Sequence, residues 1–261
     1  MMQSRDKLSD QLIDQLNDFY AYRELIGEGK MAKVYRWEGH AYKCFNEGYP
    51  QDWLDYEMHI QNIVHGTDLN TVAYYPCSIP STIKMDLVVG KSLAERVLKE
   101  KYKNGVEDLI SLFSSVHAIR GLDLPKLTPY LKEVMPKVPV DEALKNRALT
   151  YIAELPDEDV LCHLDFHFLN LMHANDDYTI IDWVNAKSGH PLYDFARSYV
   201  IFYEFAFRLS GKYLKLLKKA YVYNESELKK AIFVMALHRL TETDSIRIRT
   251  LIDQLSQDLT F

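Results

Sequence analysis

Three polar side chains close together in the sequence are of the types that phosphoryl transfer requires. Residues 163–170 read His-Leu-Asp-Phe-His-Phe-Leu-Asn, and residues 180–183 read Ile-Ile-Asp-Trp. Transfer of a phosphoryl group from a nucleotide needs a carboxylate that orients the attacking hydroxyl and accepts its proton, and oxygen ligands that hold Mg²⁺ on the phosphates. Asp165 meets the first requirement, and Asn170 and Asp182 meet the second.

The local sequence predicts how Asn170 and Asp182 come together. Residues 169–172 and 178–181 are typical of two short strands, and the turn-forming residues 175–177 (Asn-Asp-Asp) lie between them. A hairpin centred on this turn places Asn170 opposite Asp182, with Cβ atoms roughly 4.5–5.5 Å apart. Both side chains are then expected to reach one oxygen-seeking cation. A turn-flanking carboxylate that accepts backbone N–H groups is the alternative for either aspartate alone, but the joint pattern favours catalysis.

The same segment resembles the aminoglycoside phosphotransferase and choline kinase-like family, which comprises small-molecule relatives of the protein kinases. That family carries H-G-D-x-x-x-x-N in its catalytic loop and I-D-W or I-D-F at its metal-binding strand end. Here Leu164 replaces the glycine. The family continues with G-x-P-x-x-D-L-A, and residues 189–196 read Gly-His-Pro-Leu-Tyr-Asp-Phe-Ala. The resemblance implies that Asp194 supports the catalytic segment from the start of the next helix, where the helix dipole also favours a carboxylate.

A glycine-containing loop lies near the start of the chain. Residues 24–37 are typical of strand, loop and strand, and Gly27 and Gly29 lie in the loop. Glycines there let backbone N–H groups approach phosphates. This pair alone is a weak signal, because Ala32 stands where protein kinases have a third glycine. No helix signal follows, so a dinucleotide-binding fold is not indicated.

The next predicted strand, residues 41–45, places a lysine on an apolar face. Alternation puts Lys43 on the same side as Ala41 and Phe45. A lysine there needs an anionic partner, or an edge position from which it reaches water. The Ala-x-Lys pattern resembles the kinase strand whose lysine contacts the α- and β-phosphates. The resemblance implies that Ala41 packs on the adenine, with Val34 beside it.

A helix predicted over residues 51–64 carries the expected partner of Lys43. Glu57 lies next to the apolar side of this helix. The resemblance implies that Glu57 pairs with Lys43 and holds its ammonium group against the phosphates. Asp55 is the competing partner, and a solvated carboxylate is the alternative role for Glu57.

Composition favours a soluble enzyme. Of the 261 residues 48% are hydrophobic, and the three scattered cysteines imply no disulfide framework, which suits a reducing cytoplasm. Residues 1–10 show no signal peptide, and Glu204 interrupts the longest apolar stretch, so we expect a cytoplasmic protein without a membrane span. A net charge of −6 argues against nucleic-acid binding and favours cationic over anionic ligands.

The order of the predicted elements, strands first and helices later, is typical of an α+β fold. With the resemblance, it predicts a two-lobed protein-kinase-like fold: a β-rich nucleotide-binding lobe over residues 1–86 and a helical catalytic and substrate-binding lobe over residues 87–261. Backbone groups of Met85 and Leu87 in the connector are expected to hydrogen-bond adenine. The other predictions are strands over 22–26, 32–37, 41–45, 73–76 and 83–86, helices over 7–19, 106–119, 141–154, 193–209 and 225–240, a capping box at Ser92 and Glu95, and a proline-rich loop over 124–139.

These observations predict an ATP- or GTP-dependent, Mg²⁺-requiring kinase that phosphorylates a hydroxyl group of a small molecule, such as an aminoglycoside-like compound or an amino alcohol. Tyr199, Tyr203 and Glu204 are the expected contacts for a cationic acceptor. A protein substrate is disfavoured, because the segment from Asp182 to Asp194 is too short for an activation loop. A nucleotide-binding pseudokinase or regulatory module is the other alternative, and the intact set of chemical residues argues against it.

Overall fold

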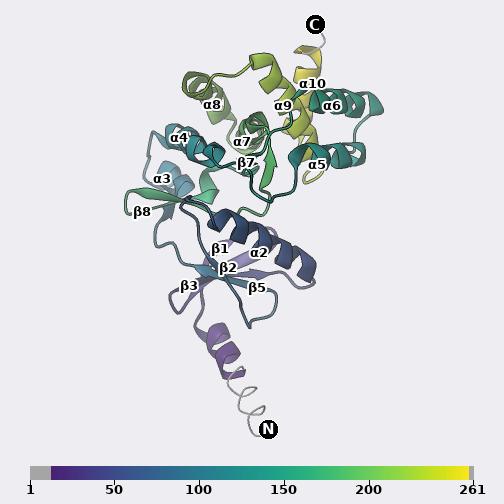
Figure 1. The fold of residues 1–261 in the computed structure, drawn as a ribbon. Helices are drawn as coiled ribbons and strands as arrows, with labels where there is room; N and C mark the ends of the chain where they lie inside the picture. Colours follow the sequence, from purple (N-terminus) through teal and green to yellow (C-terminus); the bar gives the residue numbers. More distant parts are fainter. Residues whose placement is uncertain (1–12, 259–261) are drawn as a thin grey trace. The chain divides into compact units, whose positions relative to one another are not determined.

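The computed structural model describes residues 13–258, and they divide into two compact units (Figure 1). The first unit runs up to Gly90 and also includes Ala174–Ile180, whereas the second comprises Lys91–His173 and the residues from Ile181 onward. The segment Ala174–Ile180 belongs to the first unit because Ile180 N donates to Asn70 O at 2.9 Å and Asn70 Nδ2 donates to Asp177 Oδ2 at 2.9 Å. The chain therefore passes between the units after Gly90, after His173 and after Ile180, whereas the sequence prediction was a single boundary after residue 86.

A five-stranded antiparallel sheet forms the first unit, in the order β1-β2-β3-β5-β4. The tight turn between β2 and β3 is made by Glu38 and Gly39, whose φ angles of 44° and 74° give the twist that a two-residue hairpin requires. All five predicted strands are confirmed. Their bounds, with that of the helix between β3 and β4, are β1 (Glu24–Glu28), β2 (Ala32–Trp37), β3 (His40–Phe45), α2 (Gln51–His65), β4 (Tyr74–Tyr75) and β5 (Thr82–Asp86).

The two faces of this sheet have different roles. An aromatic cluster covers one face, where Phe19 packs edge-on against Trp37 at 5.4 Å between ring centroids and against Tyr42. Phe19 comes from a helix that covers residues 13–22, so the predicted helix over 7–19 lies partly outside the described residues. Because side chains alternate along β3, Lys43 lies on the other face, where it meets α2.

Helices dominate the second unit, and α7 (Pro191–Phe205) is its most buried helix, packing against α8, α9 and α10 (Figure 1). The capping box is confirmed, because Glu95 N donates to Ser92 Oγ at 3.1 Å and Ser92 N donates to Glu95 Oε2 at 3.2 Å. The other helices are α3 (Leu93–Lys99), α4 (Gly105–Ala118), α5 (Leu127–Val134), α6 (Glu142–Glu154), α8 (Phe207–Ala220), α9 (Glu225–Arg239) and α10 (Ile246–Asp258).

Short strands and 3-10 turns connect the helices. Strand β7 pairs with β10 in antiparallel fashion, with Cys162 opposite Lys187. Strand β6 pairs with β8, with Ser92 opposite Met172. The bounds of these elements are β6 (Lys91–Ser92), η1 (Met135–Lys137), β7 (Val160–Cys162), η2 (Phe168–Asn170), β8 (Leu171–Ala174), β9 (Asp177–Ile180) and β10 (Lys187–Gly189).

Two sequence predictions for this unit are wrong, and one helix was missed. The proline-rich segment contains α5, because Pro129 lies in the first turn, where the missing N–H removes no hydrogen bond. The helix predicted over 193–209 ends at Phe205, since Ala206 leaves helical geometry at φ −138° and α8 begins beyond it. Helix α10 was not predicted, although its apolar residues Ile248, Leu251, Ile252 and Leu255 have helical spacing.

Within residues 13–258, no helix is both long enough and apolar enough to cross a membrane.

The close approach of β10 to α5 gives a stability prediction. A Cβ atom at Gly189 would lie 2.6 Å from Leu127 Cβ, and Leu127 is fully buried. We expect Gly189→Ala to lower the free energy of unfolding by about 1–3 kcal/mol, the usual cost of overpacking a core, as measured by urea denaturation. The matched control is Gly211→Ala in α8, where a new Cβ meets nothing within 4 Å, and a helical alanine should raise stability by up to about 1 kcal/mol. Unchanged stability of Gly189→Ala would contradict this packing.

Candidate active site

The segment 163–170 forms a loop between β7 and the turn η2, and His163 fixes its start. The imidazole is fully buried. Its Nδ1 accepts the N–H of Asp165 at 3.2 Å, so the ring proton lies on Nε2, which donates to Ile181 O at 3.1 Å. Burial lowers the pKa of His163, which keeps the ring neutral at pH 7. His163 thus ties the loop to the residue that precedes Asp182.

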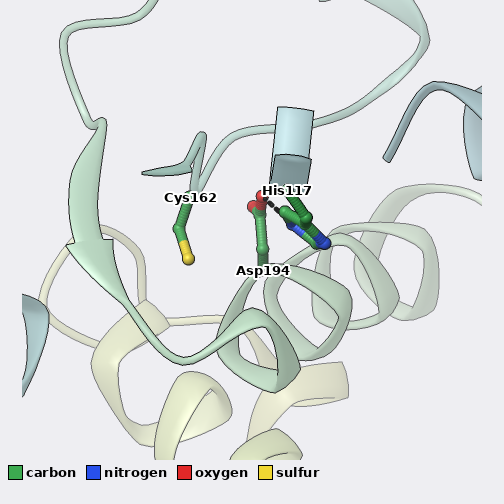
Figure 2. A group of neighbouring side chains, drawn as sticks. All are labelled: His117, Cys162 and Asp194. Carbon is green, nitrogen blue, oxygen red and sulfur yellow. Dashed lines mark hydrogen bonds and ion pairs between the residues drawn. The ribbon is translucent and has the colours of Figure 1, made fainter. Parts of the chain in front are cut away.

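Asp194, at the start of α7, holds the same loop through hydrogen bonds to its backbone. Its Oδ2 accepts the N–H of His163 at 3.0 Å, and its Oδ1 accepts the N–H of Leu164 at 2.8 Å. His117, on α4, contacts Oδ2 through Nε2 at 3.1 Å, as Figure 2 shows. The carboxylate is fully buried, so its charge is balanced by these donors rather than by water. The supporting role that the resemblance implied for Asp194 therefore has a direct geometric basis.

Leu164, which replaces a glycine of the family pattern, has a φ of 60°. This is the left-handed region, where an L-residue with a Cβ is strained by roughly 1–2 kcal/mol. Bonds on both sides hold it there: Asp194 accepts from its N–H, and Arg197 Nε donates to its O at 3.1 Å. The loop therefore keeps the glycine-type conformation without glycine, through contacts from α7.

Asp165 is ionised and partly exposed. Asn170 Nδ2 donates to Asp165 Oδ2 at 3.1 Å, and His167 Nε2 lies 3.3 Å from the same oxygen. Burial would raise the pKa of Asp165, but the His167 contact and the charge of Arg197 outweigh it and hold that pKa well below the usual range. A carboxylate in this state can orient a hydroxyl group and accept its hydrogen bond.

Asn170 and Asp182 lie on neighbouring pieces of backbone. Ile181 N donates to Asn170 O at 3.0 Å, so the residue that opposes Asn170 is Ile181 and not Asp182 as predicted. Asn170 is buried at the end of η2 rather than in a strand, and Asp182 has a φ of 65°, which ends the strand alternation. The two predicted strands around the turn exist as β8 and β9, and Asn175 and Asp176 have the positive φ angles of a tight turn.

In the first unit, Lys43 and Glu57 form the predicted ion pair. Lys43 Nζ lies 2.7 Å from Glu57 Oε1, and the side chains are 16% and 2% exposed. Tyr74 OH also donates to Glu57 Oε1, at 3.2 Å. The competing carboxylate, Asp55, instead accepts from Gln51 Nε2 at 2.8 Å on the exposed side of α2. The buried Glu57 carboxylate thus fixes where the Lys43 ammonium lies on the sheet.

The residues predicted to surround adenine lie on adjacent strands of the same sheet. Val34 is opposite Lys43, and Ala41 is opposite Met85, so all four lie in the central strands β2, β3 and β5. Leu87 follows directly after β5.

The glycine loop closes between β1 and β2. Gly27 pairs with Val34 after a register shift in β1, and Gly29 N donates to Ala32 O at 2.9 Å.

One cluster of potential metal ligands is structural. His117, Cys162 and Asp194 offer ligand atoms within 4.8 Å of one another (Figure 2). Both Asp194 oxygens already accept backbone N–H groups, however, and burial raises the pKa of the Cys162 thiol well above its ordinary value. Metal binding needs a thiolate and available lone pairs, so we assign this cluster to loop support.

The structure corrects the expectation of a cation-binding patch on α7. Glu204 is 7% exposed and its Oε2 lies 2.7 Å from Arg239 Nε. Tyr203 OH donates to Gln254 Oε1 at 3.1 Å. Because an arginine already balances the charge of Glu204, this carboxylate does not attract an acceptor cation.

Arg197 and His117 were missed by sequence reasoning. Arg197 lies one helical turn after Asp194, which was a usable signal, because residues three apart share a helix face. His117 is 77 positions from Asp194 and carries no local signal.

Residues 74–229, more than half of the chain, match the sequence model of the phosphotransferase enzyme family. A search among proteins of curated function found no match. The chain is also similar to solved structures. The ADP-bound aminoglycoside phosphotransferase APH(2'')-Ib is 13% identical with a TM-score of 0.61 and 96% coverage of both chains. The choline kinase LicA from Streptococcus pneumoniae is 13% identical with a TM-score of 0.60, covering 96% of this chain and 98% of that one.

A third similar structure, the amicoumacin kinase hAmiN in complex with AMP-PNP, Ca²⁺ and Ami, is 8% identical with a TM-score of 0.63, covering 99% of this chain and 95% of that one. At these identities the likeness shows the fold, and the predicted α+β, kinase-like architecture with a β-rich first part and a helical second part is confirmed.

The bonds of Asp194 give a prediction about the loop. Asp194→Asn would replace one acceptor oxygen with an NH₂ group that faces a backbone N–H, so we expect a loss of stability of about 1–3 kcal/mol. Thermal and urea unfolding measure it. Asp123→Asn, at an exposed position, is the matched control and should change stability little. If the two variants were equally stable, the carboxylate would not be holding the loop.

Proposed function

Because the chain belongs to the phosphotransferase enzyme family, and so is a kinase with a hydroxyl acceptor, we propose that it transfers the γ-phosphate of ATP (or GTP) to a small molecule. The observation that carries the proposal is the set of contacts at Asp165. An ionised, partly exposed carboxylate there is held by Asn170 and His167 on a loop that α7 anchors. Similar structures contain ADP or AMP-PNP, which supports a nucleotide as donor.

Asp165 is the proposed catalytic base. Its carboxylate would accept the hydrogen bond of the acceptor hydroxyl and orient the oxygen in line with the γ-phosphate. Asn170 Nδ2 donates to both the carbonyl and a carboxylate oxygen of Asp165, so it limits rotation of that side chain. The pair thus supplies orientation before any substrate arrives.

Asn170 and Asp182 are the proposed Mg²⁺ ligands. Both offer side-chain oxygens of the kind that Mg²⁺ prefers, and the Ile181–Asn170 backbone bond keeps their chain segments adjacent. Bound Mg²⁺ would neutralise charge that develops on the phosphates. The chain's own contribution would be to supply these two oxygen donors from adjacent segments.

The first unit supplies the proposed nucleotide contacts. Lys43, fixed by Glu57, would contact phosphate oxygens, and Gly27 and Gly29 would present backbone N–H groups to phosphates. Apolar Val34 and Ala41 would pack on adenine. Backbone groups of Met85 and Leu87 would hydrogen-bond its edge.

We propose a small-molecule acceptor, with aminoglycoside-like compounds and amino alcohols as the first to test. The support is indirect: similar structures are described with streptomycin, with hygromycin B or as choline kinases. The alternatives are a protein substrate and a catalytically inactive nucleotide-binding module. Phosphate transfer from γ-labelled ATP, scored over a metabolite and antibiotic panel, separates all three.

Free thiols at Cys44, Cys77 and Cys162 fit the cytoplasmic location that we propose.

The metal assignment predicts how a nucleotide stabilises the protein. Mg²⁺-ATP should raise the melting temperature of the wild type, because a ligand that binds only the folded state stabilises it by mass action. Asp182→Ala should abolish the Mg²⁺-dependent part of this shift. Asp159→Ala, which removes an exposed partner of Arg120, is the control and should leave it intact. A normal Mg²⁺-dependent shift in Asp182→Ala would remove Asp182 from the proposal.

The base assignment predicts a loss of turnover without a loss of binding. Asp165→Asn should keep the fold and the ATP-induced rise in melting temperature, since the amide has the same shape. Turnover should fall by roughly 10²–10⁴-fold, the usual contribution of a general base. Steady-state kinetics with any accepted substrate measure this, and a kcat close to that of the wild type would rule out Asp165 as the base.

A further inference from the structure

A small cavity inside the helical unit has no role in the proposed chemistry. It has a volume of about 20 Å³ and is lined by Leu164 of the catalytic loop and by residues of α5, β10, α7 and α9. A volume of this size takes a water molecule or one small polar group. Two of its lining residues, Asn185 and Glu242, are exposed, so the cavity is open to solvent.

Arg197, which lines this cavity, has a guanidinium donor without a partner among the described residues. The residue is 2% exposed. Its Nε donates to Leu164 O, and its Nη2 donates to both carboxylate oxygens of Glu242 at 2.8 and 2.7 Å. Over residues 13–258, Nη1 has no hydrogen-bond partner. A buried guanidinium nitrogen is rarely left without an acceptor, so this donor is matched by the oxygen of a water molecule or of a ligand in the cavity.

His238 has a second buried nitrogen without a hydrogen-bond partner among the described residues. Tyr130 OH lies 3.0 Å from its Nε2, while its Nδ1 has no hydrogen-bond partner among the described residues. Glu242 Oε1 is 3.6 Å from Nδ1, beyond bonding distance. Burial, and then the charge of Arg197, lower the pKa of His238 to about 4, so the ring is neutral at pH 7. In the tautomer in which Tyr130 OH donates to Nε2, the ring proton lies on Nδ1, and His238 can donate it to a ligand at the cavity that it lines.

The charge around the cavity is positive. Lys187 is 7% exposed, and its ammonium lies 4.5 Å from the centroid of the Tyr130 ring. Burial lowers the pKa of Lys187 to about 8, which leaves it mostly protonated at pH 7. The one carboxylate in the lining, Glu242, is shared between Arg197 and Arg239. Cations therefore outnumber anions here, although the whole chain has a net charge of −6.

We propose that this cavity binds an anionic group, a carboxylate or a phosphate, carried by the acceptor that the enzyme phosphorylates. The proposal rests on the proposed function, because Leu164 in the cavity wall directly precedes the base Asp165. A ligand held by its anionic group at Arg197 and His238 and by its hydroxyl at Asp165 is fixed at two points, which is what orientation of an attacking oxygen requires. The acceptor class is then a hydroxyl compound with a carboxylate or phosphate, including an amino alcohol that also carries a carboxylate.

Inorganic phosphate, without Mg²⁺ or nucleotide, is the probe for the first test. Titration calorimetry and melting temperature should show that wild type binds phosphate, and that Lys187→Met weakens it by about tenfold or more, as loss of a charged contact does. Lys132→Met, at an exposed position of α5, is the surface control and should bind normally. Lys43→Met, on the sheet, removes the proposed nucleotide-phosphate contact, and the part of phosphate binding that depends on Lys187 should persist in this variant. Equal binding by wild type and Lys187→Met, or loss in Lys43→Met alone, would overturn the proposal.

A second variant and a kinetic test guard against a folding defect. His238→Phe keeps an aromatic ring but removes Nδ1, and it should also weaken phosphate binding while retaining the wild-type response to Mg²⁺-ATP. With an acceptor found by panel, Lys187→Gln should raise KM for an anionic acceptor by about tenfold or more and leave kcat within about twofold, because it removes binding common to ground and transition states. A panel that returned only acceptors without an anionic group would overturn the proposal. Absence of ATP turnover would refute the proposed function, while the phosphate titration would still decide the cavity.

Discussion

The buried carboxylate of Asp194 is the contact on which the candidate active site depends. A buried charge is tolerated only when hydrogen-bond donors replace the water it has lost, and here the donors include the backbone N–H groups of His163 and Leu164. The same bonds that satisfy the charge therefore set the path of the loop. His163 in turn fixes two further segments, because one of its ring nitrogens accepts from Asp165 N and the other donates to Ile181 O. Two chemically important segments are in this way fixed by one helix.

Helix α7 achieves this with three residues on one face. Asp194, Arg197 and Ser198 are spaced i, i+3 and i+4, so they share one face of the helix. Asp194 and Arg197 both bond to the backbone of Leu164, and Ser198 bonds to the backbone of Phe166. Almost every residue of α7 is buried against other helices, so the face that holds the loop cannot easily rotate. The strain of the left-handed Leu164 is offset by this packing. An active-site loop without its expected glycine thus shows that conformation can be imposed from outside the loop.

Local chemistry was readable from the sequence, and long-range pairing was not. Asp165, Asn170 and Asp182 could be proposed because phosphoryl transfer restricts both residue type and spacing. The strands of the first unit were predicted correctly because alternation is a local property. Alternation wrongly predicted that Asp182 opposes Asn170. Asp182 has a positive φ, which turns its side chain out of the strand pattern. The role predicted for Glu204 was wrong because its partner, Arg239, lies 35 positions away on another helix. The sequence shows which charged side chains are present, whereas tertiary contacts decide which of them are free to bind a ligand.

The membership of Ala174–Ile180 in the first unit has a consequence for synthesis of the chain. The first unit includes the segment Ala174–Ile180, which is translated only after residues Lys91–His173 of the second unit. On a ribosome, residues up to Gly90 emerge early, but Asn70 and Thr71 must wait for Asp177 and Ile180 before their hydrogen bond and bridge form. Domains generally fold from the N-terminus as units during translation, and here that order is interrupted. All five strands of the N-terminal sheet are translated before this segment, so what must form late is the contact that the segment makes with the chain between α2 and β4.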